Sequence, residues 1–283
     1  MDIATQFDQL FQQAVNAIDH GDVDALEQLL TAHPELVRER LHEPGDWLRD
    51  QTGNALQGFF KSPYLLWFVS EDAVRNNTLP ANIVEVTNTI IQVMKQQQVD
   101  SLQDQLDYTL LLVAWSGVAA KCNVQVPLMD ALIDAGASPR AIPNNALVNG
   151  HFAAAEHAVQ RGAPLTLASA LCLDRWDDAA QLVQTATAPE KQFAFVLCAL
   201  NGRAKALSWL IPYGVDLNAP CPDLYAHGTP LHHAVWSGSL DAVKVLLEAG
   251  ASLDVKDTAW NLTPLGWAKY GKRHEIIAYL KSL

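Results

Sequence analysis

Residues 229–253, TPLHHAVWSGSLDAVKVLLEAGASL, contain the start and stop signals of two short helices and the turn between them. Thr229 is a typical helix N-cap, and Pro230 suits the first helical position, where its missing N–H costs nothing. We expect the first helix to end at Gly238 and the second, with Asp241 in its first turn, to end at Gly250. The second helix has one apolar face, made of Leu240, Val243, Leu246 and Leu247. Neither helix is long enough to be stable alone, so the pair must stack on similar pairs.

This stretch resembles an ankyrin repeat, a family whose pattern runs T-P-L-H-x-A, then G, then V-x-x-L-L-x-x-G-A. The next segment repeats the pattern, with Thr263, Pro264 and Leu265 at matching offsets. The resemblance implies stacked helix pairs, short β-hairpin fingers between them, and a role in binding other proteins. We therefore predict an all-α fold with such fingers, an ankyrin-like α-solenoid of about eight helix–turn–helix repeats.

The pattern divides the chain, predicted to be a single solenoid domain over residues 1–283, into five segments. Residues 1–36 form an N-terminal capping repeat, and residues 37–61 form a long insert with turn signals at its Pro and Gly residues. Irregular repeats follow over 62–143, and short repeats joined by tight loops over 144–192. Regular repeats and a C-terminal cap occupy 193–283. Fingers are expected at 219–228, presenting Asp223, Leu224 and Tyr225, and at 254–262, presenting Asp257 and Trp260.

The charge balance bears on the class of partner. The 283 residues include 19 Lys and Arg against 31 Asp and Glu, a formal net charge of −12. This argues against binding to nucleic acid or to an anionic membrane, because phosphate groups are bound by basic surfaces. A charged partner would be basic. The polar ends of the predicted stack favour a monomer.

The sequence favours a cytoplasmic location. The four Cys residues form no C-x-x-C pair and no disulfide framework, which indicates buried thiols in a reducing compartment. The N-terminus has neither the basic nor the apolar region of a signal peptide. No run approaches the roughly 18 apolar residues that a membrane span needs.

The sequence contains no motif that indicates catalysis, a cofactor or a metal. Nucleotide-binding glycine loops, a G-x-S-x-G element and zinc-ligand spacings are absent. The adjacent His232 and His233 would point about 100° apart on a helix, which does not suit a shared metal, and the resemblance gives His232 a structural hydrogen bond within and between repeats. Cys172 and Cys198 lie on corresponding first helices of neighbouring repeats and so could lie near each other; we interpret them as buried small apolar side chains, with a redox pair as the alternative. We therefore expect a protein that is not an enzyme.

Aromatic residues give the sharper functional signal. In ankyrin-repeat proteins the variable surface lies on the finger tips and on the concave face made by the first helices. The matching positions here form one column of Trp115, Leu200, Trp236 and Tyr270, while Tyr225 and Trp260 lie on the fingers. Exposed aromatic side chains grouped on one face are typical anchors of protein interfaces. The alternative is that these Trp rings pack between repeats, as we expect of Trp67, Trp176 and Trp209 at core positions.

Two functions are consistent with this pattern. The favoured one is a non-catalytic protein–protein interaction module or scaffold that binds another protein through its concave face and finger loops. The alternative is a ligand or peptide sensor, or a cryptic enzyme, with its site in the irregular N-terminal third, where the insert and the enlarged turns depart from the repeat pattern. Self-association through the ends of the stack is a third possibility.

Overall fold

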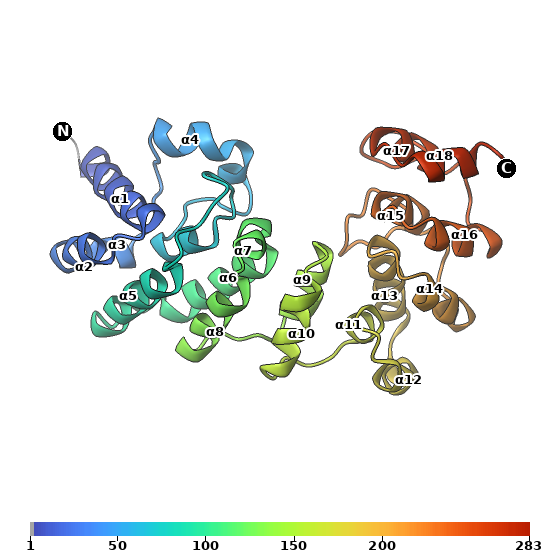
Figure 1. The fold of residues 1–283 in the computed structure, drawn as a ribbon, viewed down its shortest axis with the longest axis horizontal. Helices are drawn as coiled ribbons and strands as arrows, with labels where there is room; N and C mark the ends of the chain where they lie inside the picture. The colour runs from blue at the N-terminus through green and yellow to red at the C-terminus, as the bar shows by residue number, and fades with distance from the viewer. Residues whose placement is uncertain (1–2) are drawn as a thin grey trace. The chain divides into compact units, whose positions relative to one another are not determined.

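The computed structural model describes residues 3–283, and helices dominate the described chain (Figure 1). The contacts within the chain define two compact units. The first comprises the residues up to Ala146 together with 153–163, and the second comprises Leu147–Phe152 together with Pro164–Leu283. The prediction that residues 1–283 form one continuous solenoid domain stays a prediction.

The first unit contains the capping repeat, the insert and the irregular repeats. Three pairs of elements in this unit pack against each other: α1 with α2, η2 with α5, and α6 with α8. The second helix of the η2–α5 pair begins at Ile83. The elements are α1 (Ile3–His20), α2 (Val23–Ala32), α3 (Glu35–Arg38), α4 (Asp46–Thr52), η1 (Gly53–Gln57), η2 (Leu65–Ser70), α5 (Ile83–Gln96), α6 (Leu102–Trp115), α7 (Gly117–Lys121), α8 (Gln125–Ala135), most of α9 (Ile142–Val148) and α10 (Phe152–Gln160).

The long insert is packed against the first repeats. Leu48 and Phe60 are fully buried, and the ring of Phe60 lies 5.2 Å from that of Phe68 in an edge-to-face arrangement. Asp8 Oδ1 accepts hydrogen bonds of 2.8 Å from the backbone N–H of Gly45 and from the indole N–H of Trp47. The insert therefore covers an aromatic cluster of the first unit, because its buried side chains complete that cluster.

The second unit stacks four helix pairs. Its first helices contact one another in chain order, α11 to α13 to α15 to α17, and the second helices α14, α16 and α18 do the same. These neighbour-to-neighbour contacts confirm the stacked-repeat fold that the sequence predicted for this unit. The elements are α11 (Leu167–Cys172), α12 (Trp176–Thr185), α13 (Ala188–Leu200), α14 (Ala204–Leu210), η3 (Ile211–Tyr213), α15 (Pro230–Ser237), α16 (Leu240–Glu248), α17 (Pro264–Tyr270) and α18 (His274–Leu280).

The stretch 229–253 folds as its sequence predicted. Helix α15 begins at Pro230 after the N-cap Thr229 and ends at Ser237, followed by the C-cap Gly238 with a left-handed φ of 82°. His232 is fully buried. Its Nδ1 is bonded to the Thr229 hydroxyl at 2.8 Å and its Nε2 to the Leu262 carbonyl at 3.0 Å. The imidazole thus caps its own helix and joins it to the next repeat, which confirms the structural role expected for His232.

The finger segments are loops rather than β-hairpins. Within residues 3–283 the only bridge is an isolated antiparallel one between Cys221 and Leu224, and no strand is formed. The prediction that the fingers present Leu224 and Asp257 to a partner was also wrong, because both residues are only 3% exposed. Leu224 closes its turn against Cys221, and the carboxylate of Asp257 faces inward and holds the second finger together.

The core predictions for the other aromatic and sulfur-containing side chains hold in part. Trp67 is buried, whereas Trp176 and Trp209 are half-buried and contact each other edge to face at 6.4 Å. Cys172 and Cys198 are fully buried thiols with their Sγ atoms 3.9 Å apart, as expected from their matching positions.

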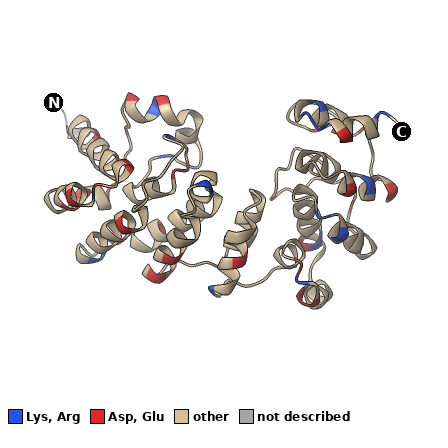
Figure 2. Cartoon of the chain, in the orientation of Figure 1, with Lys and Arg blue, Asp and Glu red and all other residues tan. Residues whose placement is uncertain are grey.

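Acidic residues are concentrated in the first unit. Of the 31 Asp and Glu residues in the sequence, 20 fall in residues 1–163 with only nine Lys and Arg, whereas the second unit carries 11 acidic and 10 basic residues. Figure 2 shows this difference as red positions that recur through α1–α10 and mixed colours in α11–α18. Among the described residues, no helix is both long enough and apolar enough to cross a membrane.

Candidate partner-binding site

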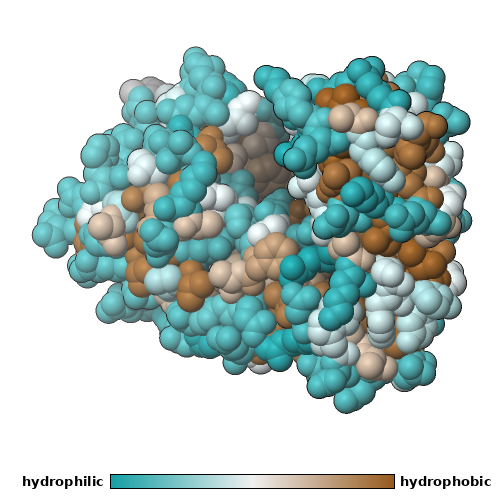
Figure 3. All heavy atoms as spheres, turned by 45° about the vertical axis from the view of Figure 1, so that its right-hand side comes forward, coloured by the Kyte–Doolittle hydropathy of each residue, from teal (hydrophilic) through white to brown (hydrophobic). Residues whose placement is uncertain are grey.

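The second unit contains a cavity of about 770 Å³ on the side of its first helices and fingers. Figure 3 shows hydrophobic residues reaching the surface of the C-terminal repeats between hydrophilic ones. Seven aromatic or imidazole side chains dominate the cavity wall, and we call their site the aromatic cavity: Tyr225, His227, His233, Trp236, Trp260, Trp267 and Tyr270. The remaining lining residues are Val148, Asn149, Gly150, Leu200, Asn201, Ser237 and Leu262.

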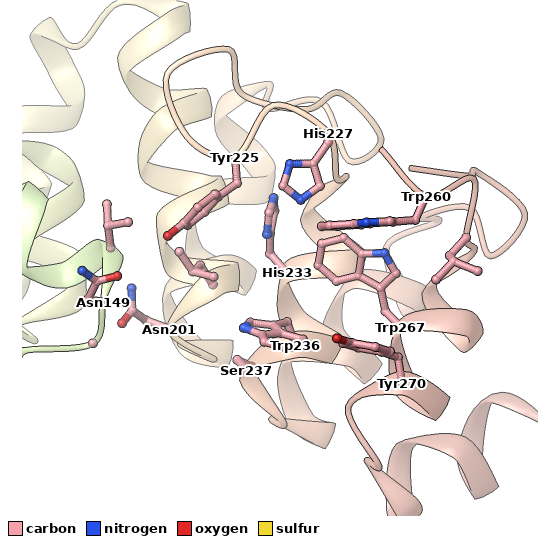
Figure 4. A pocket seen from close by; sticks show the side chains of 14 residues that line it. Asn149, Asn201, Tyr225, His227, His233, Trp236, Ser237, Trp260, Trp267 and Tyr270 are labelled. Atoms are coloured by element: carbon pink, nitrogen blue, oxygen red, sulfur yellow. The ribbon is translucent and has the colours of Figure 1, made fainter. Parts of the chain in front are cut away.

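The rings of the aromatic cavity stand on three sides of an open space (Figure 4). Trp267 forms the back, nearly perpendicular both to Trp260 (66°, centroids 5.9 Å apart) and to Trp236 (81°, 6.1 Å). Tyr270 lies nearly parallel to Trp236, at 22° and 6.5 Å. Trp260 therefore forms one side, Trp236 and Tyr270 the opposite side, and Trp267 the wall between them.

The repeat pattern places these rings. Trp236 and Tyr270 lie at the C-terminal ends of the neighbouring helices α15 and α17, so their side chains meet across the repeat boundary. Trp267 lies one helical turn before Tyr270 and is buried, 8% exposed, against the finger that carries Trp260. The finger loop 219–228 brings Tyr225, whose φ of 45° is in the left-handed region.

Asp257 fixes the second finger against α17. Its Oδ1 accepts hydrogen bonds from the backbone N–H groups of Ala259 (2.9 Å) and Trp260 (2.6 Å). Its Oδ2 accepts from the backbone N–H of Leu262 (2.8 Å) and from the indole N–H of Trp267 (3.0 Å). One buried carboxylate thus sets the position of two of the rings.

The same contacts keep Asp257 ionised. Burial alone would raise the pKa of the carboxyl group, but the four hydrogen bonds, led by that from Trp260, favour the charged form more strongly. Together they lower the pKa of Asp257 to about 2. The indole of Trp267 therefore donates to a fixed negative charge.

His233 is a neutral side chain in the cavity wall. It is only 1% exposed, and its Nε2 has no hydrogen-bond partner within residues 3–283. Burial, and then the neighbouring His227 and His232, lower the pKa of His233 to about 4. The imidazole is therefore uncharged near neutral pH.

Five of the six side chains that the sequence assigned to partner binding line this one cavity: Leu200, Tyr225, Trp236, Trp260 and Tyr270. The exposed fractions of Trp236, Trp260 and Tyr270 are 44%, 62% and 78%, so these rings do not merely pack between repeats. Trp115 belongs to the first unit, where it is half-buried and donates its indole N–H to the Asn145 carbonyl at 3.0 Å. Binding of a partner by these six residues stays a prediction.

Sequence reasoning missed three members of the wall. Trp267 lies three residues before Tyr270 on the same helix, a spacing that could have predicted its place beside the exposed column. His227 carried no signal in the sequence, because only the fold of the 219–228 loop brings it to the cavity, whereas His233 reaches the wall from α15. No group of three or more His, Cys, Asp and Glu side chains among residues 3–283 is placed to hold a metal ion.

The comparisons with known proteins match this architecture. The family model described as ankyrin repeats (3 copies) matches residues 156–257. The chain is also 30% identical over 121 residues to a cyclin-dependent kinase inhibitor 2A from Monodelphis domestica, an alignment that covers 41% of this chain and 69% of that protein. The chain belongs to the ankyrin-repeat family.

Other relatives of this ankyrin-repeat protein differ in size and kind. A cyclin-dependent kinase 4 inhibitor B from Rattus norvegicus is 30% identical over 123 residues, which cover 42% of this chain and 92% of that protein. A palmitoyltransferase ZDHHC13 from Homo sapiens is 40% identical over 74 residues, or 26% of this chain and only 11% of that protein. The similarity therefore covers only a small part of the larger relative.

Proposed function

We propose that this protein is a non-catalytic protein–protein interaction module that binds its partner in the aromatic cavity of the second unit. Ankyrin-repeat membership supports the general role of binding proteins. The finer assignment to the concave face and fingers rests on one observation. Three large rings, those of Trp236, Trp260 and Tyr270, remain 44% to 78% exposed around one cavity.

Exposed aromatic rings grouped in this way keep apolar surface in contact with water, which is unfavourable, and a bound partner would bury that surface. Each ring can bury 150–250 Å² of surface, and interface anchors are enriched in Trp and Tyr for this reason. Asp257 fixes the backbone at Trp260 before any partner arrives, which reduces the conformational entropy lost on binding. A rigid aromatic site of this kind is suited to one or two inserted side chains of a partner.

The partner that this proposal favours is a protein with basic character. The formal net charge of −12 supports it. Two of the relatives are named as inhibitors of cyclin-dependent kinases, so a protein kinase is one candidate class. The proposal includes a cytoplasmic, monomeric protein, because the four cysteines are free thiols and the predicted stack ends are polar.

A pull-down from native lysate tests the proposed site. The bait is compared with the double variant Trp236→Ala/Trp260→Ala, which removes two exposed rings and leaves the buried Trp267. Tyr213→Ala is the matched control, because Tyr213 is 37% exposed in the same unit but does not line the cavity. We expect partner recovery to fall at least ~10-fold for the double variant only. Unchanged recovery of every partner would refute the assignment of this face.

The alternative of a ligand site in the N-terminal third has less support. The insert covers an aromatic cluster there, and the buried Glu71 carboxylate and Arg75 guanidinium pair with neighbouring groups. The Glu71 carboxylate accepts from the backbone N–H groups of Arg75 (2.7 Å) and Asn77 (3.0 Å), while the Arg75 guanidinium bridges Glu71 and Asp19 at 2.9 and 2.7 Å. Such a network is accounted for by the folding of this loop alone.

A further inference from the structure

We propose that the aromatic cavity binds a methylated lysine side chain of the partner protein. This inference rests on the proposed function, since it names the chemical group that the same cavity receives. Three properties of the cavity lead to it: the arrangement of the rings, the electrostatics of the wall, and the absence of charged lining residues.

The arrangement of the rings fits a compact organic cation. Trp260 and Trp236 face the space from opposite sides, and Trp267 closes it at nearly right angles to both. A cation in that space would contact the negative faces of several rings within the ~6 Å range of cation–π attraction. A cavity of about 770 Å³ leaves room for the side chain and part of the peptide that carries it.

The wall of the cavity is electrostatically suited to a positive charge. The indole N–H of Trp267 donates to the ionised Asp257 carboxylate, which places a fixed negative charge at the edge of the back ring. His233, buried with an unpartnered Nε2, contributes a polar atom that no group of the described chain satisfies, and it adds no positive charge because it is neutral. A buried polar side chain without a partner is rare and needs an explanation, which a bound ligand can supply.

The fold already uses tryptophan faces in this way. Lys205 Nζ lies 4.0 Å from the centroid of the Trp176 ring. The Arg273 guanidinium lies 6.0 Å from the centroid of Trp236 and also donates to the Trp236 carbonyl. Arg273 does not line the cavity, so the space between Trp236 and Trp260 is left for a cation from outside.

The charge-free lining favours methylated over unmodified lysine. No Asp or Glu lines the cavity, so nothing there replaces the strongly held water shell of a primary ammonium group. Methyl groups on the nitrogen spread the charge, weaken that hydration and add apolar contact with the rings. Dimethyllysine also keeps one N–H that a neutral imidazole such as that of His233 can accept.

Titration with capped Gly-Lys-Gly tripeptides tests this inference on the full chain. One tripeptide carries ε-dimethyllysine, one carries its neutral isostere with carbon in place of the ε-nitrogen, and one carries unmodified lysine; choline is the fourth probe. Binding is followed by the indole N–H signals of the eight Trp residues in a nitrogen-15 correlation spectrum. We expect dimethyllysine to bind at least ~10-fold more tightly than each of the other three, with the largest shifts at Trp236, Trp260 and Trp267.

Two variants and a control test whether dimethyllysine binds in the aromatic cavity. Trp236→Leu and Trp260→Leu change exposed rings and should each weaken dimethyllysine binding at least ~10-fold, whereas Tyr213→Leu should leave it unchanged. Equal binding of the neutral isostere would overturn the inference in favour of a simple apolar pocket. Tighter binding of choline would assign the cavity to a free small molecule, and the absence of any indole shift would also refute the proposal.

The failure of this inference can be told apart from failure of the proposed function. If partner recovery depends on Trp236 and Trp260 but dimethyllysine does not bind, the cavity binds a protein through another side chain. If dimethyllysine binds in the cavity but partner recovery is insensitive to these two rings, the ligand chemistry is right and the partner contacts another face.

Discussion

Replacing Asp257 by Asn should destabilise the C-terminal repeat by about 3 kcal/mol. The carboxylate accepts four hydrogen bonds, two on each oxygen, at 2.6–3.0 Å. An asparagine keeps one acceptor oxygen and turns its NH₂ group toward two donors, so two charge-assisted bonds of about 1.5–3 kcal/mol each are lost. Some of that loss is recovered because the 254–262 loop can relax, which brings the expected cost to about 3 kcal/mol.

Urea unfolding and hydrogen exchange measure this cost. Because repeats contact only their neighbours, the loss of protection should be confined to α17, α18 and the adjoining finger. Asp254→Asn is the matched control on the same finger, since Asp254 is exposed and its side chain accepts no hydrogen bond from the finger. A change below about 0.5 kcal/mol for Asp257→Asn, or one equal to that of the control, would refute the role given to this carboxylate.

The pH dependence of the same variant gives a second check. Because the pKa of Asp257 in the folded protein is lowered to about 2 from 3.8, the unfolded state binds the proton more tightly. The stabilisation is therefore fully present above about pH 4 and is lost as the pH falls through about 2. The stability difference between wild type and Asp257→Asn should shrink over that window, and a difference independent of pH would contradict the assignment.

Three further changes test the packing elsewhere in the chain. Burial, and then Glu71, raise the pKa of Asp72 to about 6 from 3.8, so the stability of the wild-type protein should fall as the pH rises from about 4 to 6. In calorimetry, Asp72→Asn should be more stable than the wild type by about 1–2 kcal/mol at pH 7, a value that allows for solvent screening. Below pH 4 the two proteins should be equally stable. Gly202→Ala should lower the free energy of unfolding more than Gly250→Ala does. Both glycines have a positive φ, but a Cβ at Gly202 would lie 2.7 Å from Ser239 Cβ, whereas a Cβ at Gly250 would meet no atom within 4 Å. Equal unfolding midpoints for the two variants would contradict this. His232→Ala should cost about 2–4 kcal/mol in urea unfolding by removing a cap and an inter-repeat bond, and a loss under 1 kcal/mol would argue that the imidazole is not structural.

The regular repeats were predictable because their local signals and their packing agree. Thr229, Pro230, Gly238 and Gly250 each favour the cap or turn that the stacked pair requires. The same periodicity placed Trp236 and Tyr270 on one column, and the cavity followed from that column. In these repeats the sequence determines each helix pair through contacts that are close along the chain.

The fingers and the insert could not be predicted because their structure depends on distant partners. A loop with Asp257 at its centre has the composition of an exposed turn, but the indole of Trp267, ten residues away, draws the carboxylate inward. In the insert, Trp47 is oriented by Asp8, 39 residues earlier. Trp115 matched Trp236 residue for residue but lies in the other unit, where its indole N–H is bonded to Asn145.

Contact between the partner and the aromatic cavity of the second unit can be tested by site-specific cross-linking. Incorporation of a photoreactive benzoylphenylalanine at Tyr270, which is 78% exposed in the cavity, is compared in native lysate with incorporation at Tyr213, which lies outside it. We expect a discrete cross-linked species from position 270 that disappears when Trp236→Ala and Trp260→Ala are added. Cross-linking only from position 213, or a species at 270 that persists without the two rings, would contradict it.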